Sequence, residues 1–152
     1  MKISTCIFTA SVMCALVPLC HAKDGPQTSP QAGGRTYAQN YKDMVLATCV
    51  ATAYKNDSDV VKDAGSSVSA LRDWTYYDLE LAPLAIRDLI KEYLSRDYYN
   101  PLAESEVKGV RFDMLKCLDL YHSRALEAQV KRLVFPLDHT HRQDSPGSVK
   151  PQ

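Results

Sequence analysis

A pair of cysteines, Cys49 and Cys117, most constrains how this chain folds. The chain has five cysteines, but Cys6, Cys14 and Cys20 lie in an N-terminal stretch with the pattern of a removable leader. An exported chain with one available pair is typical of a small domain held by one intramolecular disulfide. A reduced buried pair and a reactive thiol remain alternatives, although the surroundings of neither cysteine favour a thiolate.

Residues 1–22 have the three parts of a secretory signal peptide. Lys2 gives a positive start, residues 7–19 are largely apolar, and small residues precede Lys23. The apolar run is shorter than the roughly 20 residues that a membrane-spanning helix needs. Lipid attachment at Cys20 or Cys14 is an alternative that the large preceding residues disfavour. We therefore predict a soluble protein exported to the periplasm.

The charge balance excludes one class of partner. The chain has 18 Lys and Arg against 18 Asp and Glu, and the leader removes one lysine. Nucleic-acid binding needs a concentrated basic face to displace phosphate counterions. A near-neutral chain gives no support to nucleic-acid binding or to adhesion to an acidic membrane. The partner is expected to be a protein or a small molecule.

Composition divides the mature chain into three parts. Residues 23–35 are rich in Gly, Pro, Gln, Ser and Thr, and are predicted to be a flexible N-terminus. Residues 36–135 have enough apolar residues for one core and are predicted to form the helical domain. Residues 136–152 contain Pro136, Pro146, Gly147 and Pro151 among polar residues, and are predicted to be a disordered tail.

Within the central segment, apolar residues recur at three- and four-residue spacing, which predicts helices. Thr36 is expected to cap the first helix, which ends before residues 55–58, and a second starts behind Ser58 and extends to Thr75. Ala82 and Pro83 begin a third. A fourth is predicted over residues 107–121, and Ser123 is expected to cap a fifth that Pro136 ends. The fold class is all-α, a compact bundle of about five helices with one intramolecular disulfide.

No set of residues has the pattern of an active site. The carboxylates are scattered over polar helix faces, and no glycine-rich phosphate loop or haem attachment motif occurs. His139 and His141 have a spacing that suits a metal, but they lie in the predicted tail without a third ligand. We expect no enzyme activity, no cofactor and no metal site.

The interruption between the third and fourth helices has an unusual composition. Tyr98 and Tyr99 are followed by Asn100, Glu104 and Glu106. Exposed tyrosines near acidic residues are common where a protein binds a partner. The alternative is a loop that only packs on its own domain.

Four strings resemble one protein family in their order and spacing. They are residues 41–49 (YKDMVLATC), 53–55 (AYK), 74–78 (WTYYD) and 114–123 (MLKCLDLYHS). The family is that of the immunity proteins against the fourth family of type VI secretion amidase effectors. The resemblance covers about residues 36–134 and includes both cysteines of the mature chain.

This resemblance implies a periplasmic, all-helical protein without enzyme activity. It implies that the protein binds a peptidoglycan amidase effector and occludes its active-site cleft, which protects the producing cell and its siblings. It also implies a homodimer, a two-plus-two complex with the effector, and a protruding loop that enters the cleft. By position the loop corresponds to residues 97–108, so the expected partner-binding residues are Asp97, Tyr98, Tyr99, Asn100, Glu104 and Glu106.

Two other functions remain open from the sequence. One is a periplasmic inhibitor or chaperone of a different protein target, such as a lysozyme. The other is a small metal-binding helical bundle that uses His139 and His141.

Overall fold

The computed structural model describes residues 30–145, with the side chain of Glu104 excepted. This part of the chain is helical, and its β-type pairing is limited to two isolated bridges. The helices are η1 (Gln31–Gly34), α1 (Tyr37–Ala53), α2 (Ser58–Asp73), α3 (Ala82–Leu94), α4 (Pro101–Glu106), α5 (Asp113–Tyr121), α6 (Arg124–Leu133) and α7 (His141–Asp144). The predicted all-α class is confirmed.

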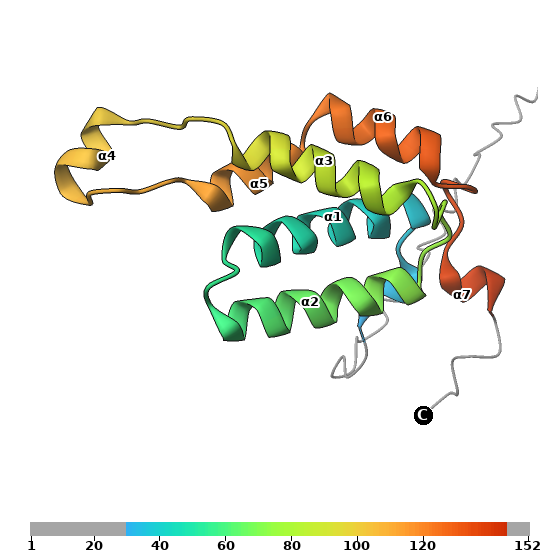
Figure 1. The fold of residues 1–152 in the computed structure, drawn as a ribbon. Coiled ribbons are helices and arrows are strands. Elements are labelled where there is room, and N and C mark those ends of the chain that lie inside the picture. Colours follow the sequence, from blue (N-terminus) through green and yellow to red (C-terminus); the bar gives the residue numbers. More distant parts are fainter. Residues whose placement is uncertain (1–29, 146–152) are drawn as a thin grey trace, which may run out of the picture.

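Helix α1 lies at the centre of the bundle and contacts α2, α3, α5 and α6 (Figure 1). Its apolar face fills the core, because Tyr37, Tyr41, Met44, Val45 and Cys49 are all buried. These residues recur at the spacing from which the sequence predicts a buried helix face. Burying aromatic and aliphatic side chains of this kind stabilises a fold by about 1.5–3 kcal/mol each.

Local sequence signals fix the helix starts. The hydroxyl of Thr36 accepts a hydrogen bond from Gln39 N and completes a capping box at the start of α1. Ser123 accepts from Leu126 N at the start of α6. Asp57 caps α2, which begins at Ser58 itself and not after it. The predicted caps at Thr36 and Ser123 are confirmed.

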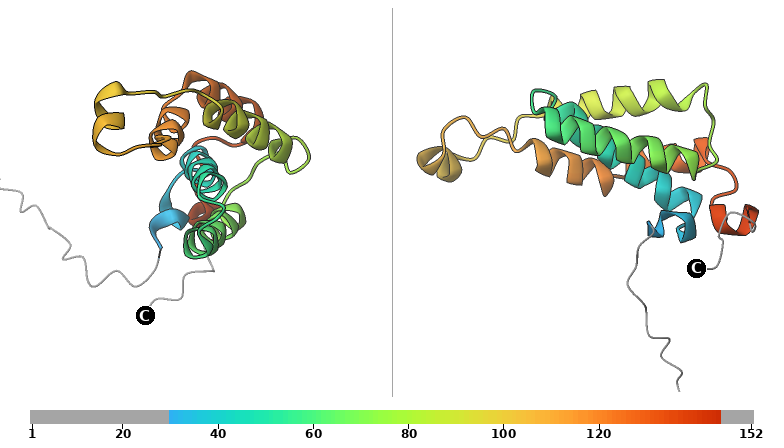
Figure 2. Two further views of the ribbon diagram at one scale, coloured as in Figure 1. Left: turned by 60° about the vertical axis from the view of Figure 1, so that its left-hand side comes forward. Right: turned by 90° about the horizontal axis from the view of Figure 1, so that it is seen from below.

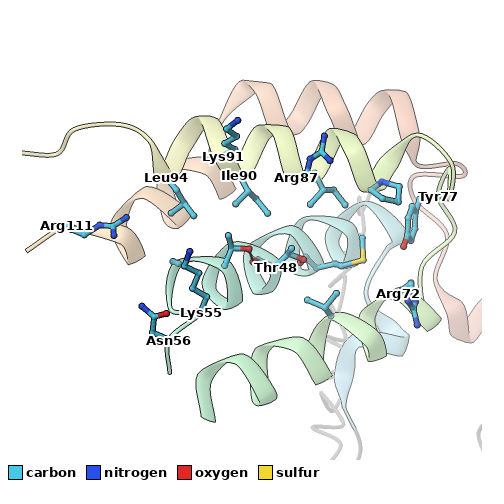
Figure 3. A pocket seen from close by; sticks show the side chains of 16 residues that line it. Thr48, Lys55, Asn56, Arg72, Tyr77, Arg87, Ile90, Lys91, Leu94 and Arg111 are labelled. Atoms are coloured by element: carbon cyan, nitrogen blue, oxygen red, sulfur yellow. Dashed lines mark hydrogen bonds between the residues drawn. The ribbon is translucent and has the colours of Figure 1, made fainter. Parts of the chain in front are cut away.

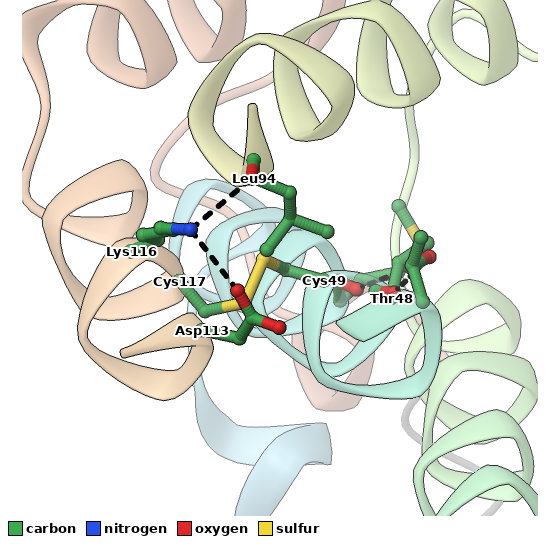
Figure 4. The surroundings of a disulfide bond; sticks show 8 residues. Thr48, Cys49, Leu94, Asp113, Lys116 and Cys117 are labelled. Carbon is green, nitrogen blue, oxygen red and sulfur yellow. Dashed lines mark hydrogen bonds and ion pairs between the residues drawn. A yellow bond between two sulfur atoms is a disulfide. The ribbon is translucent and has the colours of Figure 1, made fainter. Parts of the chain in front are cut away.

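The disulfide between Cys49 and Cys117 joins α1 to α5 (Figure 4). Both residues are fully buried, and their Cα atoms are 5.7 Å apart, within the usual range for a disulfide. The covalent bond therefore fixes α5 against the central helix, as the sequence predicts.

The prediction of a helix over residues 107–121 is wrong at its start, because α5 begins only at Asp113. Gly109 and Phe112 have left-handed backbone angles, with φ of 74° and 53°, and these angles do not continue a right-handed helix. The apolar spacing of this segment predicts that Val107, Val110, Met114 and Leu115 lie in the core, but all four are exposed. The core contribution of this segment comes from Cys117 and Leu120.

The predicted disordered tail is also wrong for the described part. Residues 137–144, here called the clasp, return to the start of α1. Tyr37 N donates to His139 O at 2.8 Å, and Ala38 N donates to Leu137 O at 3.1 Å. The hydroxyl of Tyr37 donates to Asp144 Oδ2 at 2.7 Å, and this bond lowers the pKa of the Asp144 carboxyl.

The predicted flexible N-terminus is ordered over residues 31–34, which form η1, and Ala32 is buried there. The signal peptide, residues 23–29 and residues 146–152 lie outside the described residues. Within residues 30–145, no helix is long and apolar enough to cross a membrane.

Candidate functional site

Residues 97–112, here called the arm, extend away from the bundle, with α4 at the tip (Figures 1 and 2). Within the arm, Asn100 caps α4, since its side-chain oxygen accepts from Leu102 N at 3.0 Å. Pro101 occupies the first turn, where its missing N–H costs nothing. The sequence places a loop here, and the structure adds a short helix within it.

Several large apolar side chains of the arm point outward, among polar and charged ones. Tyr99 is 68% exposed, Leu102 is 80% exposed and Val107 is 60% exposed. Asp97 and Glu106 are also exposed, which places acidic groups beside these apolar ones. Apolar side chains that have no packing role in their own domain are typical of a protein-binding surface.

Tyr98 differs from its neighbour Tyr99, because it turns toward the bundle. Its hydroxyl donates to Asp119 Oδ2 of α5 at 2.6 Å, and this hydrogen bond raises the pKa of Tyr98. Tyr98 is half-buried. It therefore fixes the outgoing chain of the arm to α5 and is poorly placed to serve as an exposed anchor.

Lys116 holds the base of the arm from beneath. This lysine is buried, and its Nζ donates to Leu94 O at 3.3 Å and to Asp113 Oδ1 at 3.1 Å (Figure 4). Its ammonium also lies 5.8 Å from the centre of the Tyr98 ring. A buried ammonium is tolerated only with such partners. Lys116 thereby joins the end of α3, the start of α5 and the arm.

The next residue after Lys116 is Cys117, so the disulfide lies directly below the base of the arm. The returning chain is fixed as well, because Arg111 Nε lies 3.3 Å from Asp113 Oδ2. A protruding segment with a fixed base loses less freedom when a partner binds it.

The six predicted partner-binding residues thus take different roles. Asp97, Tyr99 and Glu106 are exposed, whereas Asn100 caps α4 and Tyr98 packs on α5. Glu104 lies in α4, and its side chain lies outside the described residues. Sequence reasoning missed Leu102 and Val107, although apolar residues within a polar, acidic segment were the available signal.

The two histidines of the alternative metal site have other contacts. His139 Nδ1 lies 3.1 Å from Asp144 Oδ1, and the carbonyl of His139 accepts from Tyr37 N. Among residues 30–145, no three His, Cys, Asp or Glu side chains gather at metal-binding distances. In the described part of the chain these histidines belong to the clasp.

A rigid helical bundle that is stapled by a disulfide and presents one apolar arm belongs to the class of small protein-binding domains. The sequence profile of Tai4, the type VI secretion system (T6SS) amidase immunity protein, matches residues 39–130. This match covers more than half of the chain, and the chain belongs to that family. The predicted family resemblance is confirmed.

Solved structures agree with this assignment. One comes from work on new type VI-secreted toxins and self-resistance proteins in Serratia marcescens; it is 27% identical with a TM-score of 0.69. The match covers 83% of this chain and 99% of that one. Another is the effector–immunity system Tae4/Tai4 from Salmonella typhimurium, at 25% identity and a TM-score of 0.59, covering 69% and 96% of the two chains. No curated protein matches the chain.

Proposed function

We propose that this immunity protein acts in the periplasm, where it binds a cognate peptidoglycan amidase effector and closes the active-site cleft with its arm. Family membership supports the amidase as the partner. The observation that carries the mode of binding is the arm itself, with exposed Tyr99 and Leu102 above a base fixed by Tyr98, Lys116 and the disulfide.

The arm suits a cleft for physical reasons. Binding energy at protein interfaces is concentrated in a few apolar anchors that enter pockets of the partner. Leu102 and Tyr99 project from the part of the molecule farthest from the clasp, so the bundle does not obstruct them. Glu106, at the end of α4, adds a negative charge near the tip, which speeds encounter with a basic groove.

In this function the chain is an inhibitor without catalysis of its own. Export through residues 1–22 would bring it to the compartment where the amidase cleaves the cell wall. We further propose a homodimer that binds two effector molecules, as the family resemblance implies. Both arms have to remain accessible in such a pair.

The test is amidase inhibition by the variant Tyr99→Ala with Leu102→Ala. We expect inhibition to weaken by at least about tenfold, since two exposed anchors are lost. The control is Val61→Ala, an exposed apolar residue of α2 away from the arm. Unchanged inhibition by the arm variant, with wild-type inhibition intact, would exclude the arm as the inhibitory element.

A further inference from the structure

A groove of about 720 Å³ opens between α2 and α3, with α1 beneath it (Figure 3). Its apolar lining comes from three helices: Met44 of α1, Val68 of α2, and Ile86, Ile90 and Leu94 of α3. Cavities of this size bind ligands or partner segments in many proteins. The groove is separate from the exposed anchors of the arm.

The rim of this groove is basic. Lys55, Arg72, Arg87, Lys91 and Arg111 line it, and no acidic residue within the described part of the chain does so. Arg72, Arg87 and Arg111 each lie near an aspartate outside the groove. Lys55 and Lys91 have no acidic partner among residues 30–145. The positive charge of the rim therefore favours an occupant that carries carboxylates.

The cations are spread along both sides of the groove (Figure 3). A fatty acid or another molecule with a single anionic head would use only one end of such a rim. An apolar polypeptide segment with acidic residues along it matches the pattern better. The surface of the protein itself carries one such segment.

Residues 78–84, here called the corner, have this composition. Leu79, Leu81 and Leu84 are 68%, 59% and 56% exposed, and Asp78 and Glu80 are the charged residues of the segment. The corner is held rigidly, because Asp78 N donates to Leu133 O and Asp78 Oδ1 accepts from the backbone N–H groups of Glu80 and Leu81. Three exposed leucines on a rigid turn have no packing role within their own molecule.

We propose that the groove of one molecule holds the corner of a second copy, in a reciprocal two-fold pair. This inference rests on the homodimer of the proposed function and names its surface. Tyr77, at one end of the groove, directly precedes the corner, and Pro83 of the corner itself lines the groove, so one two-fold axis brings each corner to the other groove. The pair covers both apolar surfaces and brings Glu80 to the basic rim. The arms project from the opposite end of the bundle and stay accessible.

Charge reversal on each side tests this pairing by sedimentation of the exported protein. The groove variant is Lys55→Glu with Lys91→Glu, and the corner variant is Leu79→Lys with Glu80→Lys. All four side chains are exposed, so folding is expected to persist, which circular dichroism checks. Each variant alone should dimerise at least about tenfold more weakly, because like charges then face each other across the interface. The corner variant also loses the apolar side chain of Leu79.

A mixture of the two variants should regain association, since the acidic groove of one then receives the basic corner of the other. The matched control is Lys62→Glu with Lys131→Glu, two exposed lysines outside the groove. Wild-type dimerisation by both variants would overturn the proposal, and so would a monomeric wild-type protein.

Photo-crosslinking identifies the occupant directly. A photoreactive residue at Leu81 should link to groove peptides of a differently isotope-labelled copy. A link from Leu102 into the groove would mean that the arm is the occupant, and would overturn the proposal. Amidase inhibition by the wild-type protein is measured separately. A failed inhibition assay would contradict the proposed function and would leave the pairing result standing.

Discussion

The arm and the clasp look alike in the sequence and behave in opposite ways in the structure. Both segments contain many polar residues and adjoin long helices, and the sequence predicts no regular structure for the clasp or for residues 97–106 of the arm. The clasp returns to the bundle through backbone bonds to Tyr37 and Ala38, whereas the arm extends away from it. The difference lies in which hydrogen-bonding groups of the bundle each segment can contact.

The clasp accepts hydrogen bonds from backbone N–H groups that have no partner within their own helix. Tyr37 and Ala38 are the first residues of α1, and the first N–H groups of a helix have no partner within the helix. The carbonyls of His139 and Leu137 satisfy these donors. The arm is fixed only at its base, by Tyr98 and Lys116, and its tip presents Leu102 to solvent. The clasp is therefore retained because it completes the hydrogen bonds of a helix end, whereas the tip of the arm stays exposed, as the proposed binding of a partner requires.

Loss of the disulfide is expected to have the largest effect on stability. This bond supports both regions, since it joins α1, which holds the clasp, to α5, where the arm ends. The variant Cys49→Ser with Cys117→Ser opens a loop with a sequence separation of 68. The loop-entropy relation gives a loss of about 4 kcal/mol in the free energy of unfolding. Denaturant titration measures it, with the reduced wild-type protein as the comparison. A loss below about 1 kcal/mol would mean that packing alone holds α1 to α5.

The sequence was sufficient for the five long helices. Their apolar residues recur at helical spacing, and capping residues such as Thr36 and Ser123 mark the starts. It was not sufficient for the start of α5, because Val107 and Val110 continue the apolar spacing into a segment whose backbone is left-handed at Gly109 and Phe112. Periodicity records side-chain character and does not reveal such a backbone reversal.

The sequence also could not predict the contacts between segments that lie far apart in the chain. The clasp is held partly by its own carbonyls, which every residue has, so its composition gives no signal. At the candidate site the sequence located the arm, but the roles of its two tyrosines depend on Asp119, which lies 21 positions after Tyr98. The pattern could therefore indicate a protein-binding loop without separating Tyr98, which fixes the base, from Tyr99, which is exposed.

Removal of residues 136–152 tests whether the clasp belongs to the folded unit. A chain that ends at Phe135 loses the acceptors of Tyr37 N, Ala38 N and the Tyr37 hydroxyl, and we expect its unfolding free energy to fall by about 3 kcal/mol, about 1 for each bond. Thermal and denaturant unfolding measure the change. Tyr37→Phe, which removes only the hydroxyl bond to Asp144, is the control and should lose less. If the truncated chain were as stable as the wild type, the clasp, like the tip of the arm, would contribute nothing to the stability of the fold.

The smallest effect on stability is expected from the variant Tyr99→Ala with Leu102→Ala, although it should impair inhibition strongly. Both side chains are mainly exposed, so their removal changes the unfolding free energy by no more than about 0.5 kcal/mol. The matched variant is Tyr98→Phe, which breaks the hydrogen bond to Asp119 and should lose more stability than the double variant. Denaturant titration of the three proteins gives the order. If the double variant were the less stable one, the tip of the arm would pack on the bundle, and the contrast with the clasp would fail. If the predicted order holds together with lost inhibition, stability resides at the base of the arm and recognition at its tip.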